Sequence, residues 1–397
     1  MTDLVFLSAV RTGFGTFGGT LKDHSATDLG VIAAEAALAR AGLAPALVNH
    51  AIVGNAMQTS RDAMYCARHV ALRAGLAIET PAVTVNRLCG SGFEAVVQGA
   101  HRLLLDEATA VLVGGTESMS QAPHVVRGAR WGIRFGPSPL LEDALFEGLR
   151  DSYGGCAMAD TAETLAERYG ISREACEAWA LTSQRRAASA WADGVFADEV
   201  IAVPIRDRKS KQDVPWARDE HIRGDMTPEG LAKLPTVTRP GGTVTAGTAS
   251  GINDGAAMMV LTTAATAARE GATPIGRLVA WGVAGVPPEI MGIGPVPAAR
   301  QALARAGMTM DQMQLVEINE AFAAQYLAVA RDLELDPERT NVHGGAIAIG
   351  HPLGASGARI TTHLLHALRA RGGGFGLGAA CIGGGQGIAV IVEAFAP

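Results

Sequence analysis

A string of six residues, Ala-Leu-Ala-Arg-Ala-Gly, occurs twice in this chain, at 37–42 and again at 302–307. In both copies it closes a helix-like segment with a glycine at the position where helices commonly stop. In both copies an apolar, strand-like run follows, over 51–53 and over 315–318. Farther along, each half has a cysteine beside a glycine-rich turn. Because the match keeps the same order of elements, it predicts two duplicated α/β halves.

The first half of the chain alternates strand-like and helix-like segments. A strand is predicted over 4–10 and an amphipathic helix over 28–40. Strand-like runs over 81–88 and 110–113 flank a second helix. The apolar face of this helix is formed by residues at helical spacing, namely Phe93, Val96, Val97, Ala100, Leu103 and Leu104. This alternation predicts a mostly parallel sheet.

The stretch over 119–246 breaks this rhythm. It holds two helical segments, 160–169 and 173–193, and a polar, basic run over 206–211. Because strand-like runs resume after it, we predict a loop domain inserted into the first half. The predicted parts are an N-terminal half over 1–118 and 247–270, the loop domain over 119–246, and a C-terminal half over 271–397.

Composition argues against several classes of protein. A chain of 397 residues exceeds the usual span of one core, and 48% hydrophobic with 18% charged residues is typical of a globular protein. The net charge of −6 gives no support to nucleic-acid binding. We expect no signal peptide, and no membrane partner because no apolar stretch is long enough to span a bilayer. Five scattered cysteines without a CxxC pair indicate a reducing compartment, and we predict a cytoplasmic location.

Cys89 has the most reactive setting in the chain, between a strand-like run and a helix that starts near Gly90. A helix N-terminus carries a partial positive charge and unpaired N–H groups, so this position favours the thiolate. The strand-turn-helix order is also that of a nucleophile elbow, with sulfur in place of oxygen. The alternative is a buried, inert cysteine, which is the commoner fate of a lone cysteine.

Two later glycine-rich segments carry further candidate groups. His351 lies in the segment 350–354, where a ring held in a tight turn could deprotonate Cys89, and His343 competes for this role. Cys381 precedes a run of glycines whose N–H groups suit a developing oxyanion. A second thiol near the first would suit proton transfer. The structural alternatives are a satisfied turn histidine and a small residue in a crowded β-turn.

Asn319 follows the predicted strand over 315–318. An uncharged amide at a strand end can orient a water that donates to a carbonyl oxygen. A helix cap is an equally good interpretation of this asparagine on local grounds.

A glycine-rich motif near the N-terminus is misleading. The segment 13–18 matches the dinucleotide pattern G-x-G-x-x-G after a strand. That pattern needs a helix to begin within the glycines, and here the helix is predicted to begin about ten residues later. We therefore expect no nucleotide to bind there.

Taken together, these segments resemble the thiolase family, and the resemblance covers essentially the whole chain. The segments that carry it are 85–92, 114–120, 242–255, 319–323, 341–357 and 381–387.

The resemblance implies a role for each candidate group. Cys89 resembles the nucleophile that becomes acyl-cysteine, and His351 its activator, whose ring also faces the thioester oxygen in one oxyanion hole. Asn319 resembles the residue that holds the water completing that hole. Cys381 resembles the acid/base that removes or returns a proton at Cα of acetyl-CoA. Backbone N–H groups of Cys89 and Gly383 would form the second oxyanion hole, for the acyl-cysteine oxygen.

The resemblance also implies that coenzyme A lies against the loop domain. Arg223 and Ser250 match family positions that contact CoA. Met158 and Phe322 match positions around the pantetheine and the acyl group. The basic run over 208–211 could meet phosphates, although a solvated loop is the more common explanation of such a run.

Two positions depart from the family pattern. Thr248 stands where many members have asparagine. Ala157 stands where bacterial acetoacetyl-specific members often have histidine. The small residue favours the broader 3-ketoacyl-CoA members, which leave more room in the pocket.

The activity implied is that of an acyl-CoA C-acetyltransferase that works by a ping-pong mechanism. It would cleave 3-ketoacyl-CoA with free CoA into acetyl-CoA and acyl-CoA, or condense two acetyl-CoA into acetoacetyl-CoA. CoA is then a substrate, and no metal or redox cofactor is expected. The implied fold has two similar α/β halves in five α-β-α-β-α layers with the loop domain inserted. We expect a homodimer or homotetramer, with the polar segment 121–134 as a tetramer contact.

Two alternatives belong to other classes of protein. A ketoacyl synthase shares the fold and a reactive cysteine but normally uses two histidines, whereas Cys381 and Asn319 indicate a thiolase. A catalytically silent acyl-CoA-binding or scaffold protein would be expected to lose one of Cys89, His351 or Cys381, and all three are present.

Overall fold

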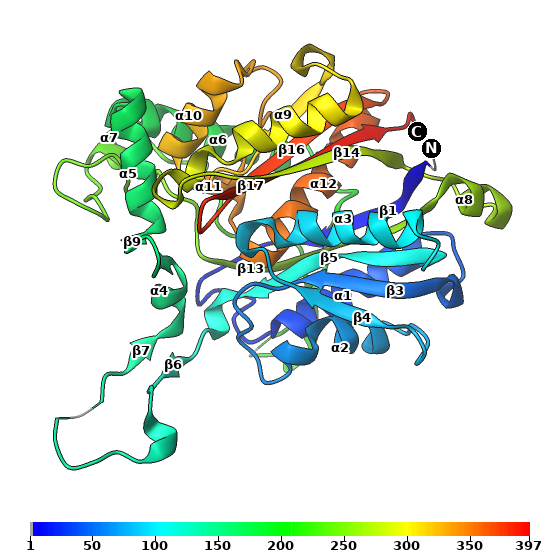
Figure 1. Ribbon diagram of the computed structural model, residues 1–397, viewed down its shortest axis with the longest axis horizontal. Helices are drawn as coiled ribbons and strands as arrows, with labels where there is room; N and C mark the ends of the chain where they lie inside the picture. The colour runs from blue at the N-terminus through cyan, green and yellow to red at the C-terminus, as the bar shows by residue number, and fades with distance from the viewer. Residues whose placement is uncertain (1–2, 138, 208) are drawn as a thin grey trace.

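The computed structural model describes residues 3–137, 139–207 and 209–397, which form five layers (Figure 1). Two helices, α1 and α2, cover the outer face of the first sheet, and α9 and α10 cover the outer face of the second. Helices α3 and α12 lie between the two sheets and contact both. The bounds of these helices are α1 Ala26–Arg40, α2 Cys66–Arg73, α3 Ser91–Leu104, α9 Pro295–Ala306, α10 Ala323–Asp332 and α12 Leu353–Ala370. The predicted layered fold is confirmed.

Four strands of each sheet follow the same order, with β4 added at the outer edge of the first, which confirms the duplication. The first runs β1-β13-β5-β3-β4 and the second β14-β17-β16-β15. The strands of the first are β1 Leu4–Thr12, β3 Val48–Gly54, β4 Ala82–Val85, β5 Ala110–Ser118 and β13 Asn253–Thr263. Those of the second are β14 Gly276–Gly285, β15 Leu315–Ile318, β16 Gly374–Ile382 and β17 Gln386–Ala394. Three residues of β1 also pair with β14, so the two sheets are continuous.

The repeated string ends α1 in the first half and α9 in the second. The glycine that closes each copy, Gly42 or Gly307, is left-handed, with φ of +62° and +65°. Such a residue ends a helix without the steric cost that a Cβ would add. Each helix leads to a strand, β3 or β15, which is parallel to the next one in its sheet.

The prediction of a mostly parallel sheet is wrong, because the sheets are mixed. Strand β13 is antiparallel to β1 and β5, and β17 is antiparallel to β14 and β16. In the second half the reason is local, since a three-residue turn over 383–385 joins β16 directly to β17 and forces a hairpin. In the first half the chain returns through β13 only after the whole insertion.

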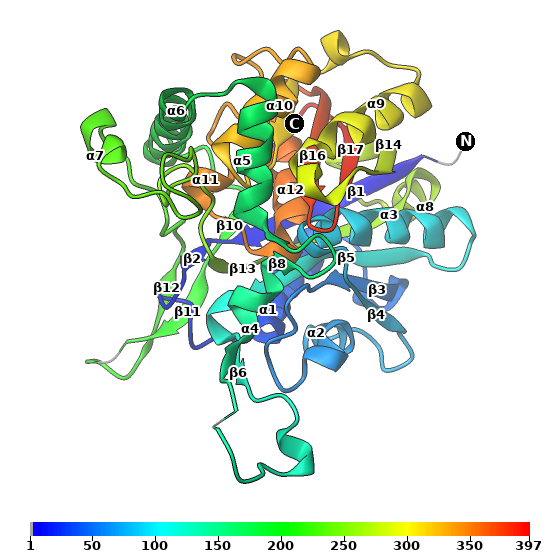
Figure 2. The same ribbon diagram turned by 60° about the vertical axis from the view of Figure 1, so that its left-hand side comes forward.

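The insertion contains the two predicted long helices and extends beyond the layered body (Figure 2). Its strand β10 joins the first sheet by pairing in parallel with β1, which the sequence pattern did not indicate. Its elements are β6 His124–Val125, β7 Glu142–Asp143, α4 Ala144–Gly148, β8 Arg150–Asp151, β9 Cys156–Ala157, α5 Met158–Tyr169, α6 Arg173–Ala192, β10 Val200–Ile201, β11 Val203–Arg206, β12 Asp213–Trp216 and α7 Pro228–Ala232.

Three short elements complete the set of strands and α-helices: β2 Gly15–Thr16, α8 Ala264–Glu270 and α11 Ala346–Ile349. The segment 13–18 leads into no helix until Ala26. Its neighbour Glu220 accepts hydrogen bonds from the N–H groups of Thr16 and Thr20, at 3.0 and 3.1 Å. Within the described ranges, no helix has both the length and the apolar character needed to cross a membrane.

Glycines allow α3 and α12 to cross very closely. A Cβ added at Gly92 would lie under 3.0 Å from the Ala358 main-chain nitrogen, and one added at Gly357 would lie equally close to that of Phe93. Real Cβ atoms do not approach backbone so closely, so only glycine fits at either position. The crossing involves the first turns of both helices. It therefore brings together the two loops that precede them, which carry Cys89 and His351.

Candidate active site

Cys89 lies in a 3-10 turn over Leu88–Gly90, between the end of β4 and the start of α3. Leu88 has a φ of +46°, a left-handed conformation that is costly for a residue with a Cβ. The turn is held by Ser91, whose hydroxyl donates to the Leu88 carbonyl at 2.7 Å and accepts the Arg87 N–H at 2.9 Å. The sequence prediction of a strand-turn-helix position for Cys89 is correct, although the strand itself ends at Val85.

The expectation that the helix N-terminus favours the Cys89 thiolate is wrong. Burial raises the pKa of this thiol to about 11, and the N–H of Gly383, which donates toward the sulfur, offsets the effect only in part. At this buried position, the cost of removing the thiolate charge from water exceeds the stabilisation that one or two N–H dipoles give to it. The resting group is therefore a neutral thiol that needs a base.

Cys381 occupies the end of β16 and is fully buried. It packs with Met291 and Ala321, and the partly buried Met158 and Phe322 cover the same cluster. Burial raises the pKa of its thiol, and the nearby Cys89 raises it further. The two cysteines, which are far apart in the sequence, thus lie near each other and both are held neutral.

His351 is only 5% exposed, in the loop between α11 and α12. Burial lowers the pKa of its imidazole to about 4, so the ring is neutral at physiological pH. Its main-chain N–H donates to Oδ1 of Asn253 at 2.9 Å. Leu353, two residues farther along, packs in the same cluster as Cys89. A neutral, buried imidazole beside a protonated thiol can act as a general base.

Asn319 follows β15 and is completely buried. Its Nδ2 lies 3.3 Å from Nε2 of His351, and its main-chain N–H donates to the Ala379 carbonyl at 2.8 Å. Its Oδ1 has no partner among the described protein atoms. The structure therefore brings Asn319 and His351 together, and the amide is not used as a helix cap.

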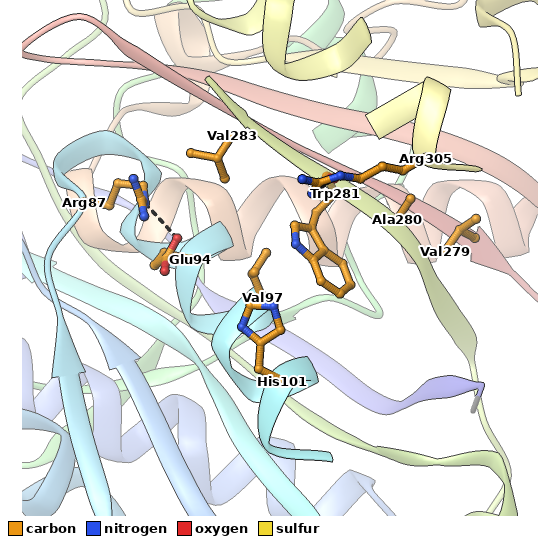
Figure 3. Close-up of a pocket in the computed structure, with 9 residues that line it drawn as sticks. All are labelled: Arg87, Glu94, Val97, His101, Val279, Ala280, Trp281, Val283 and Arg305. Atoms are coloured by element: carbon orange, nitrogen blue, oxygen red, sulfur yellow. Dashed lines mark hydrogen bonds and ion pairs between the residues drawn. The ribbon is translucent and has the colours of Figure 1, made fainter. Parts of the chain in front are cut away.

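Arg87 joins the Cys89 turn to the Cys381 turn, and sequence reasoning missed it. Its Nε donates to Glu94 at 2.7 Å (Figure 3). Its Nη1 donates to the side chain of Gln386 at 3.0 Å, and Gln386 comes immediately after the glycine turn that follows Cys381. Arg87 and Gln386 are 299 positions apart in the sequence, so no local pattern could reveal this link. Arg87 also lines a hollow of about 580 Å³ between α3 and β14, which neither cysteine lines.

Three of the four predicted CoA-contact residues, Met158, Phe322 and Ser250, lie near the Cys381 cluster, whereas the hydrogen bonds of Arg223 are with its own loop and Gln184. Met158 packs directly against Gly383, because a Cβ added at Gly383 would lie 3.1 Å from the Met158 sulfur. Phe322 pairs with Ala249 in an isolated β-bridge, which places the neighbouring Ser250 beside it. Arg223 is exposed, and its Nη1 donates to the carbonyl of Glu220 at 2.8 Å.

The basic run lies apart from Met158, Phe322 and Ser250. Of the positions 208–211, Arg208 lies outside the described residues, and the remainder belongs to the turn between β11 and β12. No contact connects this turn to either cysteine in the part of the chain that is described.

The two departures from the family pattern have distinct settings. Thr248 is buried, and its hydroxyl donates to the Thr243 carbonyl at 3.1 Å and accepts the Thr245 N–H at 2.8 Å. It closes a tight loop and is structural. Ala157 lies at the end of β9, directly before Met158, and is half-buried.

His343, the competing histidine, lies in a different environment. Its Nδ1 is 3.0 Å from Nε2 of His363, and both rings pack against Phe196. Burial lowers its pKa to about 4. His351, and not His343, is the histidine that shares a hydrogen bond with Asn319.

Comparison with known proteins agrees with this geometry. The family model for the thiolase N-terminal domain matches residues 4–265, and that for the thiolase C-terminal domain matches residues 272–394. The chain belongs to the thiolase family. The human mitochondrial 3-ketoacyl-CoA thiolase is 52% identical over 390 residues, covering 98% of each chain. An acetyl-CoA acetyltransferase of Cupriavidus necator is 45% identical, covering 99% of this chain and 100% of the relative.

Solved structures give the same result. The crystal structure of the human mitochondrial 3-ketoacyl-CoA thiolase in complex with CoA has a TM-score of 0.96 and 51% identity, covering 99% of this chain and 98% of that one. The family assignment predicted from the sequence is confirmed, and this thiolase is an acyltransferase.

The comparisons also correct one prediction. Five relatives at 50–52% identity are all named as mitochondrial 3-ketoacyl-CoA thiolases. This finding contradicts the cytoplasmic location predicted for the thiolase described here, and that prediction is wrong.

Proposed function

We propose that this thiolase cleaves 3-ketoacyl-CoA, and condenses acetyl-CoA in the reverse direction, through an acyl group carried on Cys89. The observation that supports this most is the convergence of two neutral thiols and a neutral imidazole from three separate segments. The nearby Cys89 raises the pKa of Cys381, and Leu353, the first residue of α12 and two positions after His351, packs in the Cys89 cluster. No observation favours the silent acyl-CoA-binding alternative.

In the first half-reaction, Nε2 of His351 takes the proton of the Cys89 thiol as the sulfur attacks the 3-keto carbon. The bond between C2 and C3 of the substrate then breaks, and its electrons leave with the acetyl-CoA carbanion. Cys381 gives its proton to that carbon, which releases acetyl-CoA and leaves an acyl group on Cys89. The raised pKa of Cys381 supports this role, because the group must be protonated to act as the acid.

In the second half-reaction, the Cys381 thiolate takes the proton of the CoA thiol, whose sulfur attacks the acyl-cysteine. The Cys89 sulfur leaves and recovers its proton from His351, and the acyl-CoA product departs. Every group returns to its starting state. The same steps in reverse give the condensation of two acetyl-CoA.

Two oxyanion holes are proposed to stabilise the charges that develop. Asn319 and His351 would face the thioester oxygen of acetyl-CoA, with the unpartnered Oδ1 of Asn319 positioning a water. The N–H groups of Cys89 and Gly383 would receive the acyl-cysteine oxygen. The N–H of Gly383 already donates toward the Cys89 sulfur, which supports its place in this hole.

We propose a broad range of acyl chain lengths. Met158 and Phe322 cover the Cys381 cluster, and Ala157 adds little bulk beside them. Thioether and small side chains adapt to ligands of different size. Arg223 and Ser250 are proposed to contact CoA, which the human relative binds in its crystal structure.

We also propose that residues 119–246 act as a loop domain between the halves 1–118 with 247–270 and 271–397, and that the chain forms a homotetramer. Between β6 and β7 the chain projects away from the body in both views (Figures 1 and 2). The segment 121–134 was predicted to be polar, yet Trp131 near its end is 84% exposed and Ile133 is 67% exposed. Such a cluster of exposed apolar groups is typical of a protein interface.

Light scattering on wild-type protein and on Trp131→Glu tests the assembly. A tetramer that falls to dimers in the variant supports the proposed contact. A variant with the mass of the wild type would contradict it.

The catalytic proposal is tested with acetoacetyl-, 3-ketohexanoyl- and 3-ketooctanoyl-CoA, by mass spectrometry of the Cys89 peptide and by the rate of thiolysis. We expect wild type to act on all three. Cys381→Ala and Cys89→Ala should both lose thiolysis, and no acyl adduct should form on the corresponding peptide of the Cys89→Ala variant. Full activity of Cys89→Ala would refute the mechanism, and cleavage of acetoacetyl-CoA alone would refute the broad range.

A further inference from the structure

We propose that Ser356 is a positioning residue that fixes His351 in the tautomer with its proton on Nδ1, so that Nε2 is the basic nitrogen. The inference rests on the proposed role of His351 as the base for Cys89. Ser356 lies in the first turns of α12 and is fully buried. Its Oγ is 2.6 Å from Nδ1 of His351.

The Ser356 hydroxyl has one proton, and that proton is donated to an acceptor other than His351. Oγ of Ser356 donates to the Pro352 carbonyl at 2.9 Å. Since a hydroxyl carries a single hydrogen, the bond to the imidazole must then run from Nδ1–H to a lone pair of Oγ. A neutral imidazole carries one proton, and this arrangement places it on Nδ1.

The opposite side of the ring supports the same assignment. Nε2 lies 3.3 Å from the Nδ2 amide group of Asn319, and an N–H donor at that position fits an Nε2 that accepts. The pKa of His351, lowered to about 4 by burial, means that the ring is neutral and that the choice between two tautomers matters. With the proton on Nε2 instead, His351 could not accept the proton of Cys89.

The main chain of His351 is fixed independently of its ring. Asn253 accepts the His351 N–H at 2.9 Å and donates its Nδ2 to the Gly15 carbonyl, also at 2.9 Å. Loss of the Ser356 hydroxyl should therefore free the ring to change tautomer or rotate without moving the loop.

The test compares Ser356→Ala with Thr361→Val, a matched control on the same helix. Thr361 is also fully buried, and its hydroxyl makes the same bond to the carbonyl four residues earlier, that of Gly357, at 2.9 Å, without touching His351. The assays are kcat/KM of thiolysis and the rate at which iodoacetamide alkylates the Cys89 peptide, measured by mass spectrometry. Thermal melting measures the loss of stability that both variants should share, because each loses a buried hydroxyl and its hydrogen bond to the main chain.

We expect Ser356→Ala to lower both rates by about 10- to 100-fold, by analogy with the loss found when the orienting partner of a metal-bound histidine is removed. Thr361→Val should stay within about twofold of wild type in both rates while it melts at a similarly lowered temperature. Wild-type rates in a folded Ser356→Ala would overturn the inference.

His351→Ala separates this inference from the proposed function. If His351→Ala also alkylates at the wild-type rate, the role of His351 fails. If His351→Ala is slow and Ser356→Ala is normal, only the role of Ser356 fails. Nitrogen-15 spectra of histidine-labelled wild type, with the His351 signals assigned by their loss in His351→Ala, provide a measurement that needs no Ser356 variant. An Nε2 that carries the proton would overturn the tautomer assignment.

Discussion

Gly92→Ala tests whether the close crossing of α3 and α12 sets the distance between Cys89 and His351. The added methyl group would lie under 3.0 Å from the main-chain nitrogen of Ala358, and ordinary contact begins at 3.4 Å. Because the obstacle is backbone, the two helices must separate by up to about 1 Å. Overpacking of this kind costs about 1–3 kcal/mol of unfolding free energy.

The catalytic effect should exceed the effect on stability. Both helices begin immediately after a proposed catalytic loop, so their separation moves the Cys89 sulfur away from the His351 ring. A misplacement of about 1 Å costs about 100-fold in rate, and we expect kcat/KM of thiolysis to fall by about that factor. The assay is acetoacetyl-CoA thiolysis at saturating and limiting substrate, beside thermal melting.

Gly99→Ala is the matched control on the same helix. A Cβ at Gly99 would meet a terminal methyl group of Val113 on β5, and its three nearest atoms all belong to β5 and not to α12. It should lower the melting temperature but leave kcat/KM within about threefold of wild type, since a side chain can yield where backbone cannot. Equal kcat/KM for the two folded variants would refute the idea that the helix crossing positions the catalytic groups.

Three further predictions concern protonation, the link between the turns and the pocket. The folded pKa of His351, about 4, is below its ordinary value of 6.5, so the stability from burying the neutral ring is fully present above pH 6.5 and is lost as pH falls toward 4. This loss reaches about 3 kcal/mol, and urea unfolding at pH 7 and pH 4.5 should show a smaller decrease for His351→Gln than for wild type. Arg87→Ala should leave the nearly buried Glu94 without its charged partner, while Gln98 still donates to the carboxylate, and should reduce the free energy of unfolding by about 1–3 kcal/mol. It should also lower kcat more than Arg102→Ala, a control on the exposed side of α3, and equal kcat values would argue against a linking role. Ala157→His should lower kcat/KM for 3-ketooctanoyl-CoA more than for acetoacetyl-CoA, and an equal decrease for both would contradict the chain-length argument.

Local patterns in the sequence predicted most helices, the duplicated halves and the position of Cys89, because each depends on residues close together in the chain. The repeat at 37–42 and 302–307 corresponds to helix ends with left-handed glycines, and the helix predicted to begin at Asp28 begins two residues earlier, where Ser25 caps it. Features that depend on distant partners were not predictable. They include the antiparallel return of β13, the joining of β10 to β1, and the bond from Arg87 to Gln386.

The protonation state of the candidate site was also beyond a sequence argument, and for a physical reason. The helix N-terminus next to Cys89 is visible in the sequence, but the burial that outweighs it depends on Leu145, Leu353 and other residues brought together only by folding. The sequence therefore indicated a thiolate, whereas the structure holds a thiol. The role of Ser356 was hidden in the same way, because its place in a family segment does not reveal which atom its hydroxyl contacts.

A site whose three titratable groups are all neutral at rest suits a reaction that must run in both directions. A thiolate formed in advance at Cys89 would attack readily, but burial makes that charge costly, and Cys89 must in any case recover its proton from His351 when each cycle ends. Burial raises the pKa of both thiols and lowers that of the imidazole, so no ion pair forms until substrate arrives. Each proton transfer then accompanies a change at the substrate carbon. The oxyanion holes stabilise the charge that develops in the transition state, and none of this stabilisation is needed for a charged resting state. The consequence is a requirement for accurate geometry, because neutral partners do not attract one another over a distance as ions do. The close crossing of α3 and α12, the link through Arg87 and the bond from His351 to Ser356 all serve that requirement.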